Sequence, residues 1–144
     1  MSLEGAVGTV LPPVSMTIDR GRLQLFAKAT GETDPVYSDV EAARAAGHRD
    51  LLVPPTFLFG VELEHEDPFG WYRELGVDLG RMLHGSQAFE YLVPVYAGDE
   101  VTAQSVCTDV QVKKGGAMTL LERTTTITRG DETVARLVGV TVIR

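Results

Sequence analysis

Apolar residues recur at helical spacing in the first half of the chain. Leu23, Phe26 and Ala27 repeat at intervals of three and four residues, which predicts an α-helix with one buried face. Asp19 fits the N-cap of this helix, and Gly31 fits the left-handed residue that follows a last helical turn. The pattern therefore predicts a helix between residues 19 and 31.

Two further helices are expected before residue 68. Ser38 and Glu41 have the spacing of a capping box, in which the two side chains satisfy backbone N–H groups where a helix begins. This helix would end at Gly47. In the next helix, Pro55 suits the first turn and Thr56 is a candidate cap. Its buried face would consist of four apolar residues: Phe57, Leu58, Val61 and Leu63.

Residues 67–80 contain one proline and three glycines, which predicts a loop. Trp71 and Tyr72 lie in this loop and are expected to cover the rim of a core or an interface. An acidic cluster comes just before or at the start of the loop and is expected to be a solvated helix end: Glu62, Glu64, Glu66 and Asp67.

The second half of the chain is rich in Val, Thr, Leu and Ile, which favours strands. Glycine-containing breaks indicate turns, so successive strands are expected to be antiparallel neighbours. Early helices and late strands predict an α+β fold, with an antiparallel sheet wrapped around the helix at residues 57–63. Arg136 interrupts an apolar face and is typical of an interface residue or an edge guard. The expected strands cover residues 14–18, 81–93, 99–112, 117–129 and 132–143.

The length of 144 residues matches one domain with one core. Two glycines and two prolines among residues 1–13 disfavour regular structure, so these residues are expected to form a flexible lead. A single domain is then expected at residues 14–144.

Charge and composition narrow the class of protein. Asp and Glu number 20 against 13 Lys and Arg, so the net charge is −7 and nucleic acid is an unfavourable partner. Hydrophobic residues make up 44% and charged residues 23%, which is typical of a soluble globular chain, and no apolar run reaches the ~18 residues of a membrane span. The N-terminus does not resemble a signal peptide and Cys107 has no second cysteine, so a cytoplasmic location without membrane association is expected.

Common cofactor motifs are missing from the sequence. His48, His65 and His84 lack the spacing of metal ligands, so no metal site is expected. No glycine-rich phosphate loop follows a strand, which disfavours a nucleotide-binding enzyme. Cys107 lies in the middle of an expected strand, where a buried thiol is the common case.

Three segments in a fixed order resemble a known family. They are GETDPVY at residues 31–37, LLVPPTF at residues 51–57 and LHGSQAFEY at residues 83–91, followed by Pro94 and Gly98-Asp99. Together they resemble the MaoC-like hot-dog hydratases and dehydratases, and most closely the fatty-acid-synthase-type dehydratase N-terminal branch. The resemblance covers nearly the whole chain.

This resemblance implies a hot-dog fold, in which an antiparallel sheet wraps a central helix, and pairing into a dimer or a double hot dog. It implies fatty acid metabolism and the reversible hydration of trans-2-enoyl thioesters to (R)-3-hydroxyacyl thioesters. The acyl group is carried by CoA or acyl carrier protein, and no other cofactor is implied. By position, substrate contacts would come from Asp34, Pro55, Thr56, Phe57 and Gly85.

The sequence departs from the family at the positions that transfer protons. The family loop reads Asp-x-Asn-Pro-x-His, and here Glu32, Asp34 and Tyr37 replace its Asp, Asn and His. A phenol, with a reference pKa near 10, is protonated at neutral pH and cannot act as a resting base, and displacing a carboxylate by about 1 Å can cost on the order of a hundredfold in rate. Pro55 replaces the glycine whose N–H polarises the thioester carbonyl, and proline has no N–H.

Three functions follow from these departures. In the first, the chain is the acyl-thioester-binding subunit of an (R)-specific hydratase or dehydratase, without catalysis of its own and paired with a catalytic hot-dog chain. In the second, a homodimer uses Glu32, with His84 as an alternative base. In the third, the chain is a thioester-binding module without catalysis. Local structural roles are the alternative for each residue: Glu32 and Asp34 in a turn, Tyr37 as a half-buried ring, and His84 as an ordinary strand residue.

Overall fold

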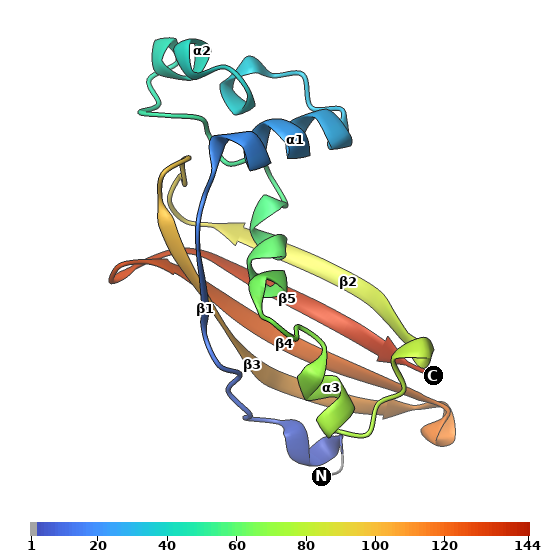
Figure 1. Cartoon of the computed structure of the whole chain (residues 1–144). Coiled ribbons are helices and arrows are strands. Elements are labelled where there is room, and N and C mark those ends of the chain that lie inside the picture. The colour runs from blue at the N-terminus through green and yellow to red at the C-terminus, as the bar shows by residue number, and fades with distance from the viewer. Residues whose placement is uncertain (1–2) are drawn as a thin grey trace.

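A five-stranded antiparallel sheet forms most of the protein, in the order β1-β3-β4-β5-β2 (Figure 1). The computed structural model describes residues 3–144. Each predicted strand is confirmed to within two residues at either end, and the α+β prediction is also confirmed. The strands are β1 (Val14–Thr17), β2 (Met82–Tyr91), β3 (Glu100–Lys113), β4 (Met118–Arg129) and β5 (Glu132–Ile143).

The expectation that successive strands are neighbours is wrong for β2. This strand pairs with β5, from Met82 opposite Ile143 to Tyr91 opposite Ala135, and not with β3. Tight turns join β3 to β4 and β4 to β5, so these three strands form hairpins, and β1 takes the other edge of β3. The free edge of β5 is therefore the place left for β2.

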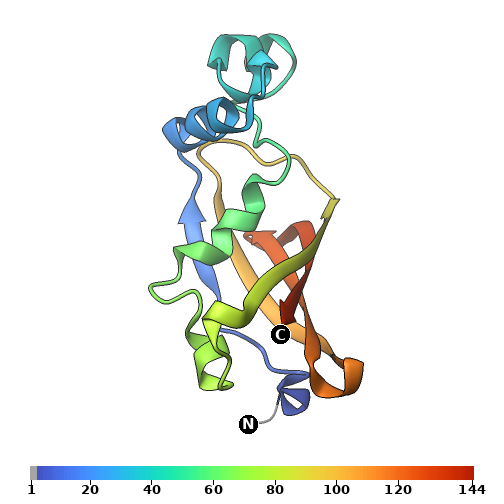
Figure 2. The same ribbon diagram turned by 90° about the vertical axis from the view of Figure 1, so that its right-hand side faces the viewer.

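Short helices surround the central 3₁₀-helix η3, which lies across one face of the curved sheet (Figure 2). Two helices, α1 and α2, lie together at one end of the molecule, and α3 lies at the other (Figure 1). Within residues 3–144, no helix is long and apolar enough to cross a membrane. The α-helices are α1 (Arg20–Thr30), α2 (Val40–Ala45) and α3 (Gly70–Glu74), and the 3₁₀-helices are η1 (Glu4–Ala6), η2 (Pro35–Tyr37), η3 (Phe57–Glu64), η4 (Leu79–Arg81) and η5 (Lys114–Gly116).

The limits of α1 are those that its sequence predicts. The Asp19 side chain accepts hydrogen bonds from the N–H groups of Gly21 and Arg22 at 2.7 and 3.3 Å. Gly31 has φ +73°, a left-handed conformation that glycine adopts at little cost. Leu23 on the inner face is fully buried.

The predicted capping box at α2 is wrong by one residue. Asp39, and not Ser38, is the N-cap, because its Oδ1 accepts the N–H groups of Glu41 and Ala42 at 2.9 and 3.3 Å. Ser38 instead closes the turn η2, since its N–H donates to the Pro35 carbonyl at 3.1 Å, as does the Asp39 N–H at 2.8 Å.

The central helix differs from its prediction in type and in cap. Its eight residues form a 3₁₀-helix, and Thr56 precedes it at φ +72° without a side-chain cap. A period of three residues places Leu58 and Val61 on one face, and Leu63 lies on another. Leu63 is 47% exposed, so its predicted place in the buried face is wrong.

Residues 3–13, the described part of the predicted flexible lead at residues 1–13, form hydrogen bonds with the sheet. Ala6 in η1 is fully buried, and Gly8 and Leu11 donate backbone hydrogen bonds to the Cys107 and Ser105 carbonyls of β3, each at 2.8 Å. Met1 and Ser2 lie outside the described residues. The segment extends the cover of the β3 edge beyond β1, where backbone groups would otherwise lack partners.

Residues 67–80 are not a plain loop, because α3 forms within them and η4 begins there. Tyr72 is buried, and its hydroxyl lies 2.9 Å from the Thr141 hydroxyl of β5. Trp71 packs beside it, 5.2 Å between ring centres. The aromatic pair therefore belongs to a second, smaller core, whose buried members are Ala6, Tyr72, Leu75, Val77, Cys107 and Leu121.

An ion pair ties α1 to the segment before Leu51. Arg20 donates from Nε and Nη2 to the two Asp50 oxygens at 3.0 and 2.6 Å, and these bonds lower the pKa of Asp50 to about 2.

We expect Asp50→Asn to unfold at lower urea concentration than the unaltered chain at pH 7, because the substitution removes this ion pair. Because the pKa of Asp50 is lower in the folded chain than in the unfolded chain, its carboxylate stabilises the fold above the unfolded-state pKa, and this stabilisation is lost on acidification. The difference between Asp50→Asn and the unaltered chain should therefore disappear between pH 4 and pH 2. Urea titrations at pH 7, 4 and 2 test this, with exposed Asp131→Asn as the control, which should show no such window.

Candidate functional site

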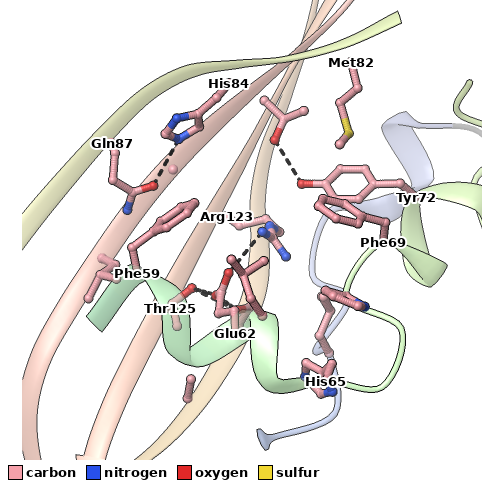
Figure 3. Close-up of a pocket in the computed structure, with 18 of the residues that line it drawn as sticks. Phe59, Glu62, His65, Phe69, Tyr72, Met82, His84, Gln87, Arg123 and Thr125 are labelled. Atoms are coloured by element: carbon pink, nitrogen blue, oxygen red, sulfur yellow. Dashed lines mark hydrogen bonds and ion pairs between the residues drawn. The ribbon is translucent and has the colours of Figure 1, made fainter. Parts of the chain in front are cut away.

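Two cavities lie beside η3, and each contains residues of β2 or of the segment that follows it. The loop pocket, of about 310 Å³, is lined by Tyr37, Pro55, Leu58, Tyr91 and Val93, among others. The polar cavity, of about 270 Å³, is lined by Phe59, Glu62, His84, Gln87, Arg123 and Thr125, among others (Figure 3). Of the residues that the sequence grouped into one site, Tyr37 and Pro55 line the loop pocket and His84 lines the polar cavity.

Tyr37 and Pro55 are the predicted site residues that meet in the loop pocket. Burial of the Tyr37 ring raises the pKa of its phenol above the ordinary value, and the nearby Glu32 and Asp34 carboxylates raise it further, as does Tyr91. The phenol is therefore protonated at neutral pH and has no capacity to act as a base there.

Glu32 and Asp34 do not line the loop pocket. Glu32 is exposed, and its Oε1 accepts the Asp34 N–H at 3.0 Å. Asp34 caps η2 by accepting the Val36 N–H at 3.1 Å. The two carboxylates thus stabilise the turn after Gly31, which is the structural alternative that the sequence left open for them.

The backbone N–H of Thr56, just before η3, already has a hydrogen-bond partner. The Thr56 N–H donates to the Tyr91 hydroxyl at 2.9 Å, and Pro55 has no N–H. Phe57 points away into the main core, where it is buried and packs edge-on against Phe26 at 5.4 Å between ring centres. Phe57, which the sequence assigned to substrate contact, is not among the residues that line either cavity.

His84 lies in the polar cavity, apart from the loop pocket. Its Nε2 is 3.3 Å from the Gln87 Oε1, and its ring lies 5.5 Å from the Phe59 ring. Gly85 sits at an irregularity in the pairing of β2 with β5 and lines neither cavity. A Cβ at this position would lie 2.8 Å from Val142 Cγ2 and 2.9 Å from the Val140 carbonyl oxygen, so close packing of the strands accounts for the glycine.

Glu62 is the site residue that the sequence missed. The expected solvation is wrong for this member of the acidic cluster, because its side chain is only 15% exposed and points toward the sheet (Figure 3). Its Oε1 accepts hydrogen bonds from the Ser105 and Thr125 hydroxyls, and its Oε2 lies 3.1 Å from Arg123 Nη2. The strand pattern could have indicated polar partners for Glu62. Arg123 and Thr125 are two residues apart in one strand, so their side chains lie on the same face of the sheet.

The polar residues continue from Glu62 along the sheet. The Arg123 guanidinium lies over the Tyr72 ring at 5.4 Å, and Tyr72 bonds to Thr141 on β5. No group of three or more His, Cys, Asp and Glu side chains among residues 3–144 is arranged to hold a metal. The polar cavity thus contains a hydrogen-bonding network, and the loop pocket contains apolar side chains and two phenols.

Comparison with known sequences gives a match over most of the chain. The family model for the FAS1-like dehydratase domain region matches residues 5–137. The UPF0336 protein of Clavibacter michiganensis subsp. michiganensis is 41% identical over 116 residues, which cover 80% of this chain and 78% of that protein.

Comparison with solved structures agrees with the arrangement of strands and helices. A MaoC-like dehydratase superposes with a TM-score of 0.84 at 23% identity, over 99% of this chain and 43% of that chain. The HadBC (3R-hydroxyacyl-ACP dehydratase) complex from Mycobacterium tuberculosis gives a TM-score of 0.78 at 22% identity, over 94% of this chain and 96% of that chain. At such identities the likeness concerns the fold, and the predicted hot-dog fold is confirmed.

Proposed function

Because the chain belongs to the FAS1-like dehydratase domain family, we propose that it is the acyl-thioester-binding subunit of an (R)-specific enoyl hydratase or 3-hydroxyacyl-thioester dehydratase. A partner chain with the same fold carries the acid and base. The thioester is bound to CoA or to acyl carrier protein, and the chain uses no further cofactor.

One observation supports this division of labour above the others, namely that no side chain described in the loop pocket is a free acid or base. Tyr37 is held protonated, Glu32 is turned outward to the Asp34 N–H, and the Thr56 N–H is bonded to Tyr91. Hydration of an enoyl thioester needs a positioned base and a donor to the developing oxyanion. The apolar walls of the pocket suit the binding of an acyl chain.

The free edge of β2 supports pairing with a second chain. Among residues 3–144, this ten-residue strand pairs on one side only, with β5. Leu83, Tyr91 and Leu92 at or next to it are between 43% and 51% exposed. An open edge with exposed apolar side chains favours addition of another strand. The HadBC structure from Mycobacterium tuberculosis is a dehydratase complex, and a complex of that kind is what we propose here.

Hydration of crotonyl-CoA tests the proposal. The purified chain alone is expected to be inactive, and activity is expected when it is mixed with a hot-dog chain that carries the intact Asp-x-Asn-Pro-x-His loop. The activity of the mixture should exceed the activity of the catalytic chain alone. Turnover by the purified chain, abolished by Glu32→Ala, would establish the homodimeric alternative instead. Acyl-CoA binding without turnover with any such partner would establish a binding module.

Replacing Tyr37 separates a wall residue from a catalytic one. Its hydroxyl makes no hydrogen bond with another residue among 3–144, so Tyr37→Phe is expected to change kcat of the assembled pair by less than about twofold. Tyr91→Phe is the matched comparison, because it leaves the Thr56 N–H without its acceptor and should lower stability by about 1 kcal/mol. A loss of kcat of a hundredfold or more in Tyr37→Phe would assign Tyr37 to the chemistry.

A further inference from the structure

The polar cavity combines apolar walls with a charged floor. Phe59, Leu63, Phe69, Met82 and Leu137 supply the apolar walls. The floor is the network of Glu62 and Arg123 with two strand hydroxyls (Figure 3). Cavities that stay empty in proteins are usually lined by apolar side chains. Polar side chains that line a cavity therefore indicate that it holds a molecule with polar atoms.

Glu62 has its hydrogen-bonding capacity largely filled. Two hydroxyl groups donate to one carboxylate oxygen, and Arg123 donates to the other. These contacts fix η3 to the sheet, and that structural role accounts for the carboxylate. They do not account for the guanidinium.

Arg123 keeps unused donors at the cavity. A guanidinium has five N–H donors, and within residues 3–144 Arg123 donates only to Glu62 and lies over the Tyr72 ring. Its side chain is 20% exposed and lines the cavity. Because Arg123 lines the cavity, a ligand oxygen that accepts hydrogen bonds would satisfy N–H groups that Glu62 leaves unused.

Charge and volume define that ligand. Glu62 already neutralises Arg123, so a second anion would be repelled by the Glu62 carboxylate, whereas a neutral oxygen would not. A cavity of about 150 Å³ holds benzene, so 270 Å³ holds roughly ten non-hydrogen atoms. The apolar walls require most of those atoms to be carbon.

We propose that the polar cavity binds a largely hydrocarbon acyl group that carries a neutral ketone or hydroxyl oxygen, which accepts hydrogen bonds from Arg123. The description of this ligand as an acyl group rests on the proposed function. The preference for a neutral oxygen depends only on Glu62, Arg123 and the walls around them.

Three small probes of about ten non-hydrogen atoms test the preference in the purified chain, without a thioester or a partner. They are 2-nonanone, its shape analogue 2-methyl-1-nonene, in which a CH₂ group replaces the oxygen, and the anion octanoate. Dissociation constants are measured at pH 8 by titration calorimetry or ligand-observed NMR. In the double variant Glu62→Leu/Arg123→Met the preference for ketone over alkene should fall by about tenfold. Octanoate should bind more weakly than the ketone to the unaltered chain.

Two further variants keep the test decisive. Replacing a buried ion pair by apolar residues is often tolerated, and if the double variant does not fold, Arg123→Lys keeps the charge but loses the planar donors and should also reduce ketone preference. Glu122→Gln removes a carboxylate on the opposite face of β4, where Glu122 bonds to Thr108, and should change nothing.

An unchanged ketone-to-alkene ratio in both Arg123 variants would overturn the proposal, as would octanoate binding as tight as the ketone or no binding of any probe. Ketone binding that persists while the crotonyl-CoA assay fails with every partner would remove the proposed function and leave the ligand preference intact.

Discussion

Asp99→Ala is expected to lower the free energy of unfolding by about 3 kcal/mol at pH 7. Asp99 is buried before β3, where it accepts hydrogen bonds from Arg49, from Arg129 at 2.7 Å and from the Tyr96 N–H at 3.0 Å. Removing the carboxylate leaves the Arg49 and Arg129 guanidinium groups without this acceptor. It also removes the hydrogen bond that stabilises the turn between Tyr96 and Asp99. Urea unfolding at equilibrium gives the value.

The pH dependence of Asp99 provides a second measurement. Burial alone would raise the pKa of Asp99, but hydrogen bonds from Arg49, Tyr96 and Arg129 outweigh it and hold the pKa below its ordinary value. The contribution of the carboxylate is therefore complete above the unfolded-state pKa, near 4, and is lost as the pH falls further. Asp131→Ala, in the exposed turn before β5, should change stability by less than about 0.5 kcal/mol. Equal effects of the two substitutions would contradict the role of Asp99.

Leu58→Ala is expected to destabilise the chain by about 3 kcal/mol, and Leu63→Ala by less than about 0.5 kcal/mol. The two residues are of one type and lie on the same short helix. Leu58 is 2% exposed within the main core, whereas Leu63 is 47% exposed. Truncation of Leu58 removes buried contacts and leaves a cavity, and truncation of Leu63 removes a side chain that is half in water.

This pair of leucines tests which face of η3 is buried. At three residues per turn, Leu58 and Val61 lie one above the other toward the core, and Leu63 lies about 120° around the helix from them. The two leucines should therefore differ in effect although they differ by only five positions in the chain. Comparable losses for Leu58→Ala and Leu63→Ala, measured by urea unfolding, would contradict this orientation of η3.

Much of the architecture could be predicted because local signals and tertiary structure agree. Asp19 and Gly31 limit α1 as expected, and the glycine-containing turns at residues 115–116 and 130–131 lie between the strands that they were expected to join. Capping side chains and left-handed glycines determine where a helix or turn begins and ends within a few residues, so their effects can be predicted from the sequence. The order of the motifs could indicate the family because that order is visible in the sequence itself.

The site was only partly predictable because its parts come together through tertiary contacts. Tyr37 and Pro55 line the same pocket, whereas His84 lines a different cavity. Glu62 was assigned to solvent from its acidic neighbours, whereas the 3₁₀ period of η3 places it on the same face as Phe59, which lines the polar cavity with it. Thr56 before η3 has φ +72°, and the Phe57 N–H donates to the Pro54 carbonyl at 3.3 Å; composition does not predict this backbone.

The residues before β1 have a consequence for the number of chains that can assemble. Together with β1, residues 8–11 occupy the edge of β3 as far as Cys107. Within the described residues, β2 is then the long strand whose outer side is unpaired. The opposite edge is formed by β1, which has only four residues against the ten of β2, so β2 is the longer edge for strand addition. If a second chain adds to β2, the pair no longer has that edge free, and further growth through it is blocked.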